Sequence, residues 1–295
     1  MNKEAIANEF RKIQEEICSE ISKLDGKSTF VSDIWKRSQG GGGNTRVLQN
    51  GNILEKAGVN FSEVFGTVTD QMKQAFGMNA EDFYATGVSI VMHPSNPFVP
   101  IIHMNIRYFE LPGQTWWFGG GIDLTPIYVD EEEASFFHQQ LKSTCDAFDP
   151  SYYSKFKQWA DDYFFIQHRN ETRGIGGIFF DHLKGAEHEK ESIFQFVCAV
   201  GRTFAATYAH IIQKKQLTVF TEENKKWQAI RRSRYVEFNL VYDRGTKFGL
   251  ESDGRVESIL MSMPPMAEWH YNYVPQPQSV EEKTLEYLKK GKAWI

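Results

Sequence analysis

Two neighbouring stretches of the chain alternate polar and apolar residues with a period of two. The polar face of residues 100–110 consists of His103, Asn105 and Arg107. The polar face of residues 88–93 includes Ser89 and His93. Because successive side chains of a β-strand point to opposite faces, both stretches are predicted to be strands. A proline-containing loop separates them, so we expect an antiparallel hairpin that gathers these polar side chains in one patch.

Residues 234–246 show the same alternation and are predicted to form a third strand of this kind. Its polar face carries Glu237, Asn239 and Asp243, and Arg244 follows directly. Taken alone, such a strand usually has a solvated outer face, and this ordinary interpretation stays open for each of the three. Taken together, the histidine and arginine side chains favour a polar cavity lined by several strands.

Glycines interrupt two further segments. Residues 115–126 are predicted to form a strand that contains Gly119–Gly121 and leads to Asp123. Glycine within a strand indicates a bulge or a close approach of the backbone to another group. The run Gly40–Gly43 predicts a flexible loop, or a mobile loop over a ligand. The glycine–lysine pattern of a phosphate-binding loop is absent.

The remaining pattern predicts an α+β protein. Helices are expected over residues 2–24, 62–76, 131–148, 150–168, 188–214 and 222–232, and additional strands over 174–180, 247–250 and 256–263. Because strands and helices do not alternate one for one, the sheet is expected to be mainly antiparallel. No internal repeat or linker divides the 295 residues, so one domain over 1–295 is predicted.

Composition excludes several classes of protein. The net charge of −5 gives no electrostatic attraction to nucleic acid. No apolar run reaches the length of a membrane span. The three cysteines are far apart, which indicates a reducing compartment and no disulfide framework. With no targeting segment in the sequence, we expect a cytoplasmic protein. Aromatic residues make up 14% of the chain, which fits thick apolar layers or a pocket for a flat ligand.

The chemistry that the residue types favour is acid–base work combined with anion binding. The candidates on or just after predicted strands are His103, Arg107, Asp123, Asp243 and Arg244. Arginine offers a planar, permanently charged fork for carboxylates, and a carboxylate in an aromatic cavity binds N–H donors or takes a proton. The eight histidines show no metal-binding spacing. A metal site assembled from distant histidines stays open as the alternative.

Long blocks of the chain resemble the oxygen-dependent coproporphyrinogen III oxidases. The blocks are residues 41–48, 92–94 continuing through 103–107, 116–126, 168–177, 234–246 and 257–264. The resemblance covers nearly the whole length. It implies a broad antiparallel sheet flanked by helices on both faces, a deep substrate cleft and a homodimer whose contact involves the segment from Tyr235 to about His270. It implies oxidative decarboxylation of two propionates of coproporphyrinogen III to vinyl groups, which yields protoporphyrinogen IX, carbon dioxide and hydrogen peroxide.

The resemblance also assigns residues. It implies substrate contacts at Ser89, Asn105, Ile106, Arg107, Asp253, Gly254 and Arg255. The proton donor matches His103, and the polar lining of the cleft matches Asp243, Arg244, Arg107 and Asp123. Some members are described with metal-binding histidines that match His93, His103, His138 and His168, and others as metal-free.

A cofactor-free reaction with dioxygen as co-substrate is the favoured expectation. Two alternatives stay open: an oxygenase that depends on a divalent metal, and a porphyrin carrier that has lost catalysis.

Overall fold

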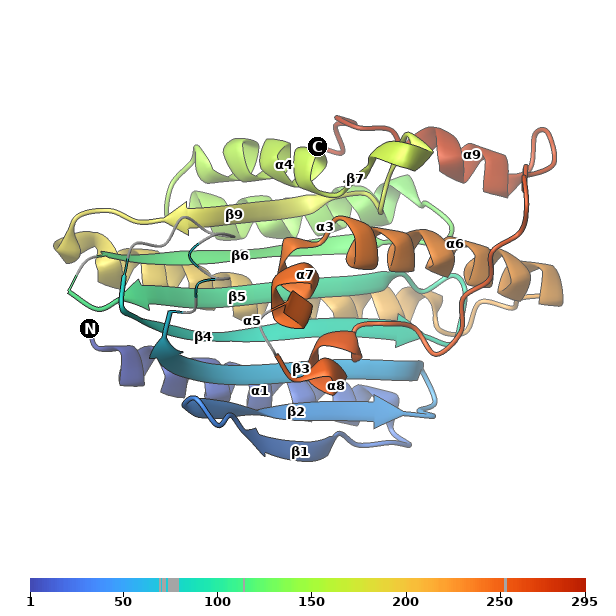
Figure 1. Ribbon diagram of the computed structural model, residues 1–295. Helices are drawn as coiled ribbons and strands as arrows, with labels where there is room; N and C mark the ends of the chain where they lie inside the picture. The colour runs from blue at the N-terminus through green and yellow to red at the C-terminus, as the bar shows by residue number, and fades with distance from the viewer. Residues whose placement is uncertain (69, 71–72, 74–79, 114, 252–253) are drawn as a thin grey trace.

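A broad antiparallel sheet forms the centre of the molecule (Figure 1). The computed structural model describes residues 1–295 except 69, 71–72, 74–79, 114 and 252–253. Within that part of the chain the sheet has seven strands in the order β1-β2-β3-β4-β5-β6-β9, and each neighbouring pair is antiparallel. The strands are β1 Val31–Lys36, β2 Gly41–Gln49, β3 Leu54–Thr67, β4 Asp82–Pro94, β5 Ile101–Leu111, β6 Thr115–Thr125 and β9 Gly177–Leu183. A two-stranded ribbon pairs β7 Phe165–Ile166 with β8 Glu171–Thr172.

Helices lie on both sides of this sheet (Figure 1). The helices of the described residues are α1 Lys3–Asp25, α3 Glu131–Asp146, α4 Tyr152–Tyr163, α5 Lys190–Lys215, α6 Glu222–Val241, α7 Arg244–Glu251, α8 Val256–Leu260 and α9 Val280–Tyr287. Two short 3₁₀ turns span Gln167–Arg169 and Glu187–Glu189. Helices α1 and α5 cover one face, and α6, α7 and α8 lie over the other. The predicted α+β class is confirmed, whereas the deep cleft stays a prediction.

The face under α1 and α5 holds the main core. Helix α1 places Ile6, Phe10, Ile13 and Ile17 toward the sheet at intervals of three and four residues. These side chains pack with the apolar residues of the central strands, such as Ile106, in one continuous cluster. Burying a side chain of this size stabilises the fold by about 1.5–3 kcal/mol. The period-two pattern of the sequence therefore sends the apolar residues to this core and the polar ones to the opposite face.

The prediction of a strand over 234–246 is wrong. Residues up to Val241 continue α6, which Thr221 begins with a reciprocal capping box to Asn224. The residues of α6 that pack inward include Trp227, Ile230, Arg231, Tyr235 and Phe238, at helical spacing. Apolar and polar residues alternate along this part of α6, and that alternation resembled the period of two of a strand. The strands predicted at 247–250 and 256–263 are also wrong, because α7 and α8 occupy these positions.

Two loop and helix predictions near the amino terminus are also corrected. The predicted helix over 62–76 is wrong for its first part, since β3 continues to Thr67, and most of the rest lies outside the described residues. The predicted glycine loop is largely strand, because Gly42 and Gly43 pair with both β1 and β3, and Gly41 pairs with β3. A side chain at Gly43 would come within 2.5 Å of the Trp35 ring. Glycine is needed here for close packing between the strands.

The other predicted elements agree with the structure apart from their ends. Helix α4 stops at Tyr163, before the predicted end at residue 168, because the chain turns into the ribbon β7–β8. Helix α6 runs nine residues beyond the predicted end at 232. No helix of the described residues is long and apolar enough to cross a membrane.

Candidate active site

The polar side chains of the central strands gather on the face under α6. Register pairs Ser89 of β4 with Asn105 of β5, and His103 of β5 with Asp123 of β6. The alternation predicted from the sequence therefore places Ser89, His103, Asn105, Arg107 and Asp123 on the same side of the sheet. Ile106 lies between two of them in sequence, but its side chain is fully buried in the opposite core. Ile106 can reach this face only through its backbone.

Asp123 is the buried centre of the cluster. Its carboxylate accepts a hydrogen bond from His103 Nδ1 at 2.8 Å. The guanidinium of Arg173 donates to both carboxylate oxygens, from Nη2 at 2.6 Å and from Nε at 3.2 Å. Burial by itself raises the pKa of Asp123, but the charge of Arg173 and the His103 hydrogen bond hold that pKa below its ordinary value. Asp123 therefore stays ionised and fixes which nitrogen of His103 carries the proton.

Arg173 is a site residue that sequence reasoning did not single out. It is 1% exposed, and its guanidinium lies against the rings of Phe164, Tyr235 and Phe238 at 4.4, 5.0 and 4.6 Å from their centres. Its Nη1 donates to Asn239 Oδ1 at 3.0 Å. A fully buried arginine with a bidentate carboxylate and aromatic neighbours needs all of these partners. The cluster thus joins β6, the segment after β8, and α6.

Asp243 lies between α6 and α7, where it begins the second helix. Its Oδ1 accepts a hydrogen bond from the Tyr163 hydroxyl at 2.8 Å. Its Oδ2 accepts bonds from the backbone N–H of Thr246 at 2.7 Å and from the Thr246 hydroxyl at 2.8 Å. The backbone N–H of Arg244 donates to the same Tyr163 hydroxyl at 3.2 Å. A carboxylate has about four lone-pair positions, so Asp243 keeps capacity for one more donor.

The segment from Gly254 onward lies at a different place. Asp253 is outside the described residues. The guanidinium of Arg255 forms an ion pair with Asp33 of β1, and Gly254 N–H bonds to the Gly249 carbonyl at 2.9 Å. Helix α8 is fastened to β2 by a 2.7 Å hydrogen bond between Ser258 and Thr45. The predicted substrate residues thus form one group on β4–β6 and a second group over β1–β3.

Comparison with known proteins identifies the family. The family model described as Coproporphyrinogen III oxidase matches residues 5–294. The chain belongs to the coproporphyrinogen III oxidase family. It is similar to a protein from Arabidopsis thaliana named coproporphyrinogen-III oxidase 1, chloroplastic, at 47% identity over 97% of this chain and 77% of the relative. It is also similar to a Glycine max protein named oxygen-dependent coproporphyrinogen-III oxidase, chloroplastic, at 46% identity over the same shares.

In this member of the coproporphyrinogen III oxidase family, the four histidines considered as metal ligands have other partners. His93 is buried and bonds through Nε2 to the Ser262 carbonyl at 2.8 Å. His138 bonds to the Tyr153 hydroxyl at 2.9 Å and the Ile175 carbonyl at 3.0 Å, and His168 to Tyr242 and Glu237, both at 2.7 Å. No group of three or more histidine, cysteine, aspartate or glutamate side chains is arranged to hold a metal ion in the described part of the chain. These residues do not fit a four-histidine metal site.

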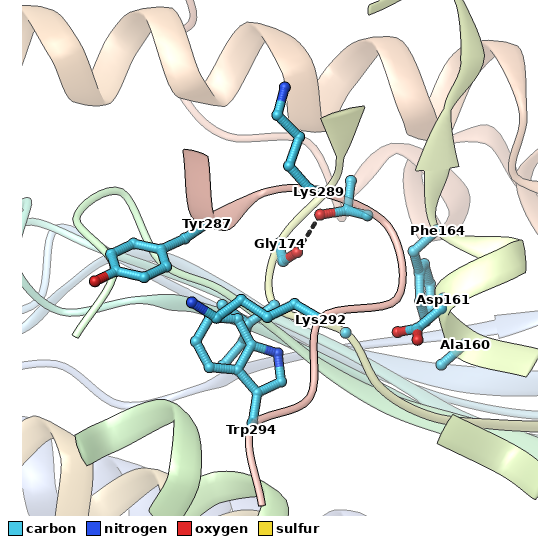
Figure 2. Close-up of a pocket in the computed structure, with 11 residues that line it drawn as sticks. Ala160, Asp161, Phe164, Gly174, Tyr287, Lys289, Lys292 and Trp294 are labelled. Atoms are coloured by element: carbon cyan, nitrogen blue, oxygen red, sulfur yellow. Dashed lines mark hydrogen bonds between the residues drawn. The ribbon is translucent and has the colours of Figure 1, made fainter. Parts of the chain in front are cut away.

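A recess next to the Arg173 segment is closed by the carboxyl-terminal residues (Figure 2). Figure 2 shows Asp161 of α4 and Phe164, which follows that helix, on one side of Gly174, Tyr287 on the other side, and Lys292 and Trp294 below it. The Lys157 ammonium donates to Asp161 at 2.5 Å and to the Lys292 carbonyl at 2.7 Å. The Leu288 carbonyl accepts the backbone N–H of Thr172 at 2.9 Å. The tail therefore holds the chain just before Arg173 and the helix α4 beside it.

Proposed function

We propose that the chain catalyses the oxygen-dependent conversion of coproporphyrinogen III to protoporphyrinogen IX in haem biosynthesis. In each of two steps a propionate and one dioxygen give a vinyl group, carbon dioxide and hydrogen peroxide. The bond from the side chain to its carboxylate breaks, and dioxygen takes up two electrons and two protons. The observation that carries the proposal is the polar face itself: a buried Asp123–Arg173 pair oriented toward His103, beside Arg107, on a sheet of this family.

The properties of the substrate match this face. Coproporphyrinogen III has an apolar macrocycle, four carboxylates at its rim and four pyrrole N–H groups. Arg107 or Arg244 would bind a propionate, since a guanidinium fits a carboxylate in two-point geometry. Asp243 would accept a pyrrole N–H donor with its remaining lone-pair capacity. His103, held by Asp123, would position or transfer a proton.

Dioxygen is proposed to react with the electron-rich pyrrole directly, without a resident cofactor. The peroxide formed on the substrate then removes the proton next to the ring, and loss of carbon dioxide yields the vinyl group. Conversion of coproporphyrinogen III by chelator-treated protein, with and without dioxygen, tests this step. Activity restored only by added metal would contradict it. Tight binding of substrate without turnover would indicate a carrier instead.

Asp243→Asn tests the assigned centre of the reaction. Asparagine keeps the size and the helix-capping ability of the side chain but loses the carboxylate charge. We expect kcat to fall by about 10²-fold or more, in the range that general acid–base groups contribute. Initial rates of protoporphyrinogen formation and a thermal unfolding curve of the same preparation measure the two effects separately. Near-native turnover in a well-folded variant would remove Asp243 from the mechanism.

We further propose a homodimer and a cytoplasmic location. The dimer is supported by large apolar side chains that are exposed in the segment that the resemblance associates with the contact: Leu240 at 47%, Met266 at 61% and Trp269 at 56%. A reducing compartment such as the cytoplasm is supported by the three cysteines, which are all free and buried. The names of both relatives specify the chloroplast for those proteins. Fractionation of cells that express the full chain tests the compartment.

A further inference from the structure

We infer that Asp181 is a positioning residue that holds the guanidinium of Arg107 across the backbone of Gly119, ready for a substrate carboxylate. Sequence reasoning did not single out Asp181, and no role follows for it from the proposed chemistry. The inference rests on the proposed function, because it concerns the carboxylate that Arg107 would bind.

The geometry begins with a side chain that crosses a whole strand. Arg107 lies on β5, and its register partner on β6 is Gly119. The neighbour of β6 on its other side is β9, which carries Asp181. Arg107 Nη2 nevertheless lies 2.9 Å from Asp181 Oδ1. The guanidinium therefore extends over β6 and forms its ion pair two strands away.

A second contact fixes the plane of the guanidinium. Arg107 Nη1 donates to Asn105 Oδ1 at 2.9 Å. Two contacts at two different nitrogens define the orientation of a planar group, which a single ion pair does not. The guanidinium carries five N–H donors, so donors remain for an incoming carboxylate. Such pre-organised arginine forks bind carboxylates with geometric specificity.

Gly119 makes room for this arrangement. A Cβ at this position would lie 2.7 Å from Arg107 Nε and 2.7 Å from Asp181 Oδ1. The two glycines that follow have different reasons for lacking a side chain. A Cβ at Gly120 would meet the Asn105 carbonyl at 2.6 Å, and one at Gly121 the Ile178 carbonyl at 2.7 Å. Gly119 is thus the member of the run whose side chain would collide with the ion pair rather than with backbone.

The pair is placed for function rather than for stability. The side chains of Arg107 and Asp181 are 34% and 21% exposed, so substrate can reach them. Ion pairs with this exposure contribute little to the free energy of unfolding. Arg107 also acts on the hydrogen-bonded pair of Tyr163 and Asp243. Burial and the Asp243 charge raise the pKa of Tyr163, and the charge of Arg107 opposes that shift. The guanidinium of Arg107 is therefore electrostatically coupled to this pair.

A double-mutant cycle tests the inference. Asp181→Asn removes the counter-charge and keeps the size of the side chain. If Asp181 acts through Arg107, Asp181→Asn lowers kcat/KM by about tenfold in the wild-type background and by less than about twofold in an Arg107→Ala background. An equal loss in both backgrounds would overturn the inference, because Asp181 would then act independently of Arg107.

Gly119→Ala gives a second arm that does not change either charged residue. The displaced atoms are the ends of flexible side chains, so we expect an unchanged melting temperature together with a loss of kcat/KM similar to that of Asp181→Asn. That loss should also vanish in the Arg107→Ala background. A fully active, well-folded Gly119→Ala variant would contradict the proposed path of the side chain. Asp162→Asn is the matched control. It removes the ion pair between Asp162 of α4 and Lys290 of the tail, and it should leave turnover unchanged.

The same cycle is run on the dissociation constant of coproporphyrin III, measured by fluorescence quenching. This oxidised tetracarboxylate needs no turnover. If the wild-type protein makes no vinyl product, the proposed function fails, and the coupling between Asp181 and Arg107 is still decided by binding. If the wild type turns over but the two substitutions are additive in both rate and binding, the inference fails alone.

Discussion

Asp123 and Arg173 form a buried pair whose two members depend on each other. Asp123→Ala leaves the guanidinium of Arg173 buried without its carboxylate. Breaking a buried pair in this way lowers the free energy of unfolding by about 3–5 kcal/mol. We expect the double replacement Asp123→Ala with Arg173→Leu to cost less than Asp123→Ala alone. Urea unfolding of the wild type and the two variants measures this difference. A double variant less stable than Asp123→Ala would show that the pair is not coupled in this way.

The same pair predicts a pH dependence with a defined sign. The folded-state pKa of Asp123 lies below its ordinary value of 3.8. Its contribution to stability is therefore present above about pH 3.8 and is lost as the pH falls through the lower folded-state pKa. Asp123→Asn should lack this part of the acid-induced loss.

At the scale of residues, the sequence predicted which side chains share one face of a strand. It did not predict contacts between residues that are far apart in the chain. His103, Asn105 and Arg107 were found on one face because a strand alternates. Arg173 lies within the block of residues 168–177, and nothing in its sequence neighbourhood predicts that it reaches Asp123. Asp181 lies two strands away from Arg107 in the sheet, on a strand far along the chain. Local sequence patterns therefore could not predict this ion pair.

At the scale of elements, the central strands were predictable and α6 to α8 were not. Strand-like alternation in β4 to β6 reflects burial of one face by apolar residues. In α6 the buried set includes Gln228, Arg231 and Arg232, so a hydrophobicity pattern does not mark its inner face. The buried arginines have partners such as Glu171, Glu55 and the Pro94 carbonyl. Polar burial therefore hid the helical period in the segment that ends at Asp243.

The carboxyl-terminal tail after α9 is an element whose removal has a predicted effect. Deleting residues 289–295 removes the Lys290–Asp162 ion pair, the Lys292 carbonyl that accepts from Lys157, and the Trp294 ring stacked on His138. We expect the melting temperature to fall by roughly 4–8 °C, since each kcal/mol corresponds to a few degrees in a protein of this size. Differential scanning fluorimetry measures it. Lys289→Ala, at an exposed position, is the control and should melt like the wild type.

At the scale of the whole molecule, the proposed dimer predicts a concentration-dependent association. Trp269 is exposed, and large aromatic side chains of this kind dominate interfaces. Replacing it by alanine should therefore raise the dissociation constant of the dimer at least tenfold, or about 1.4 kcal/mol. Sedimentation velocity over a range of concentrations measures it. Val31→Ala on the edge strand β1, at a position that is also exposed but outside the segment from Tyr235 to His270, serves as the control. A wild-type chain that sediments as a monomer throughout would contradict the dimer.

The order of the strands has a consequence for synthesis on the ribosome. Strands β1 to β6 follow one another as antiparallel neighbours, so each can pair soon after it emerges. The counter-ions of this polar face, Arg173 for Asp123 and Asp181 for Arg107, are both translated later. A nascent chain that stops after β6 therefore displays Asp123 and Arg107 without their counter-ions. We expect chaperones to bind such a chain until the rest of the polypeptide has been synthesised.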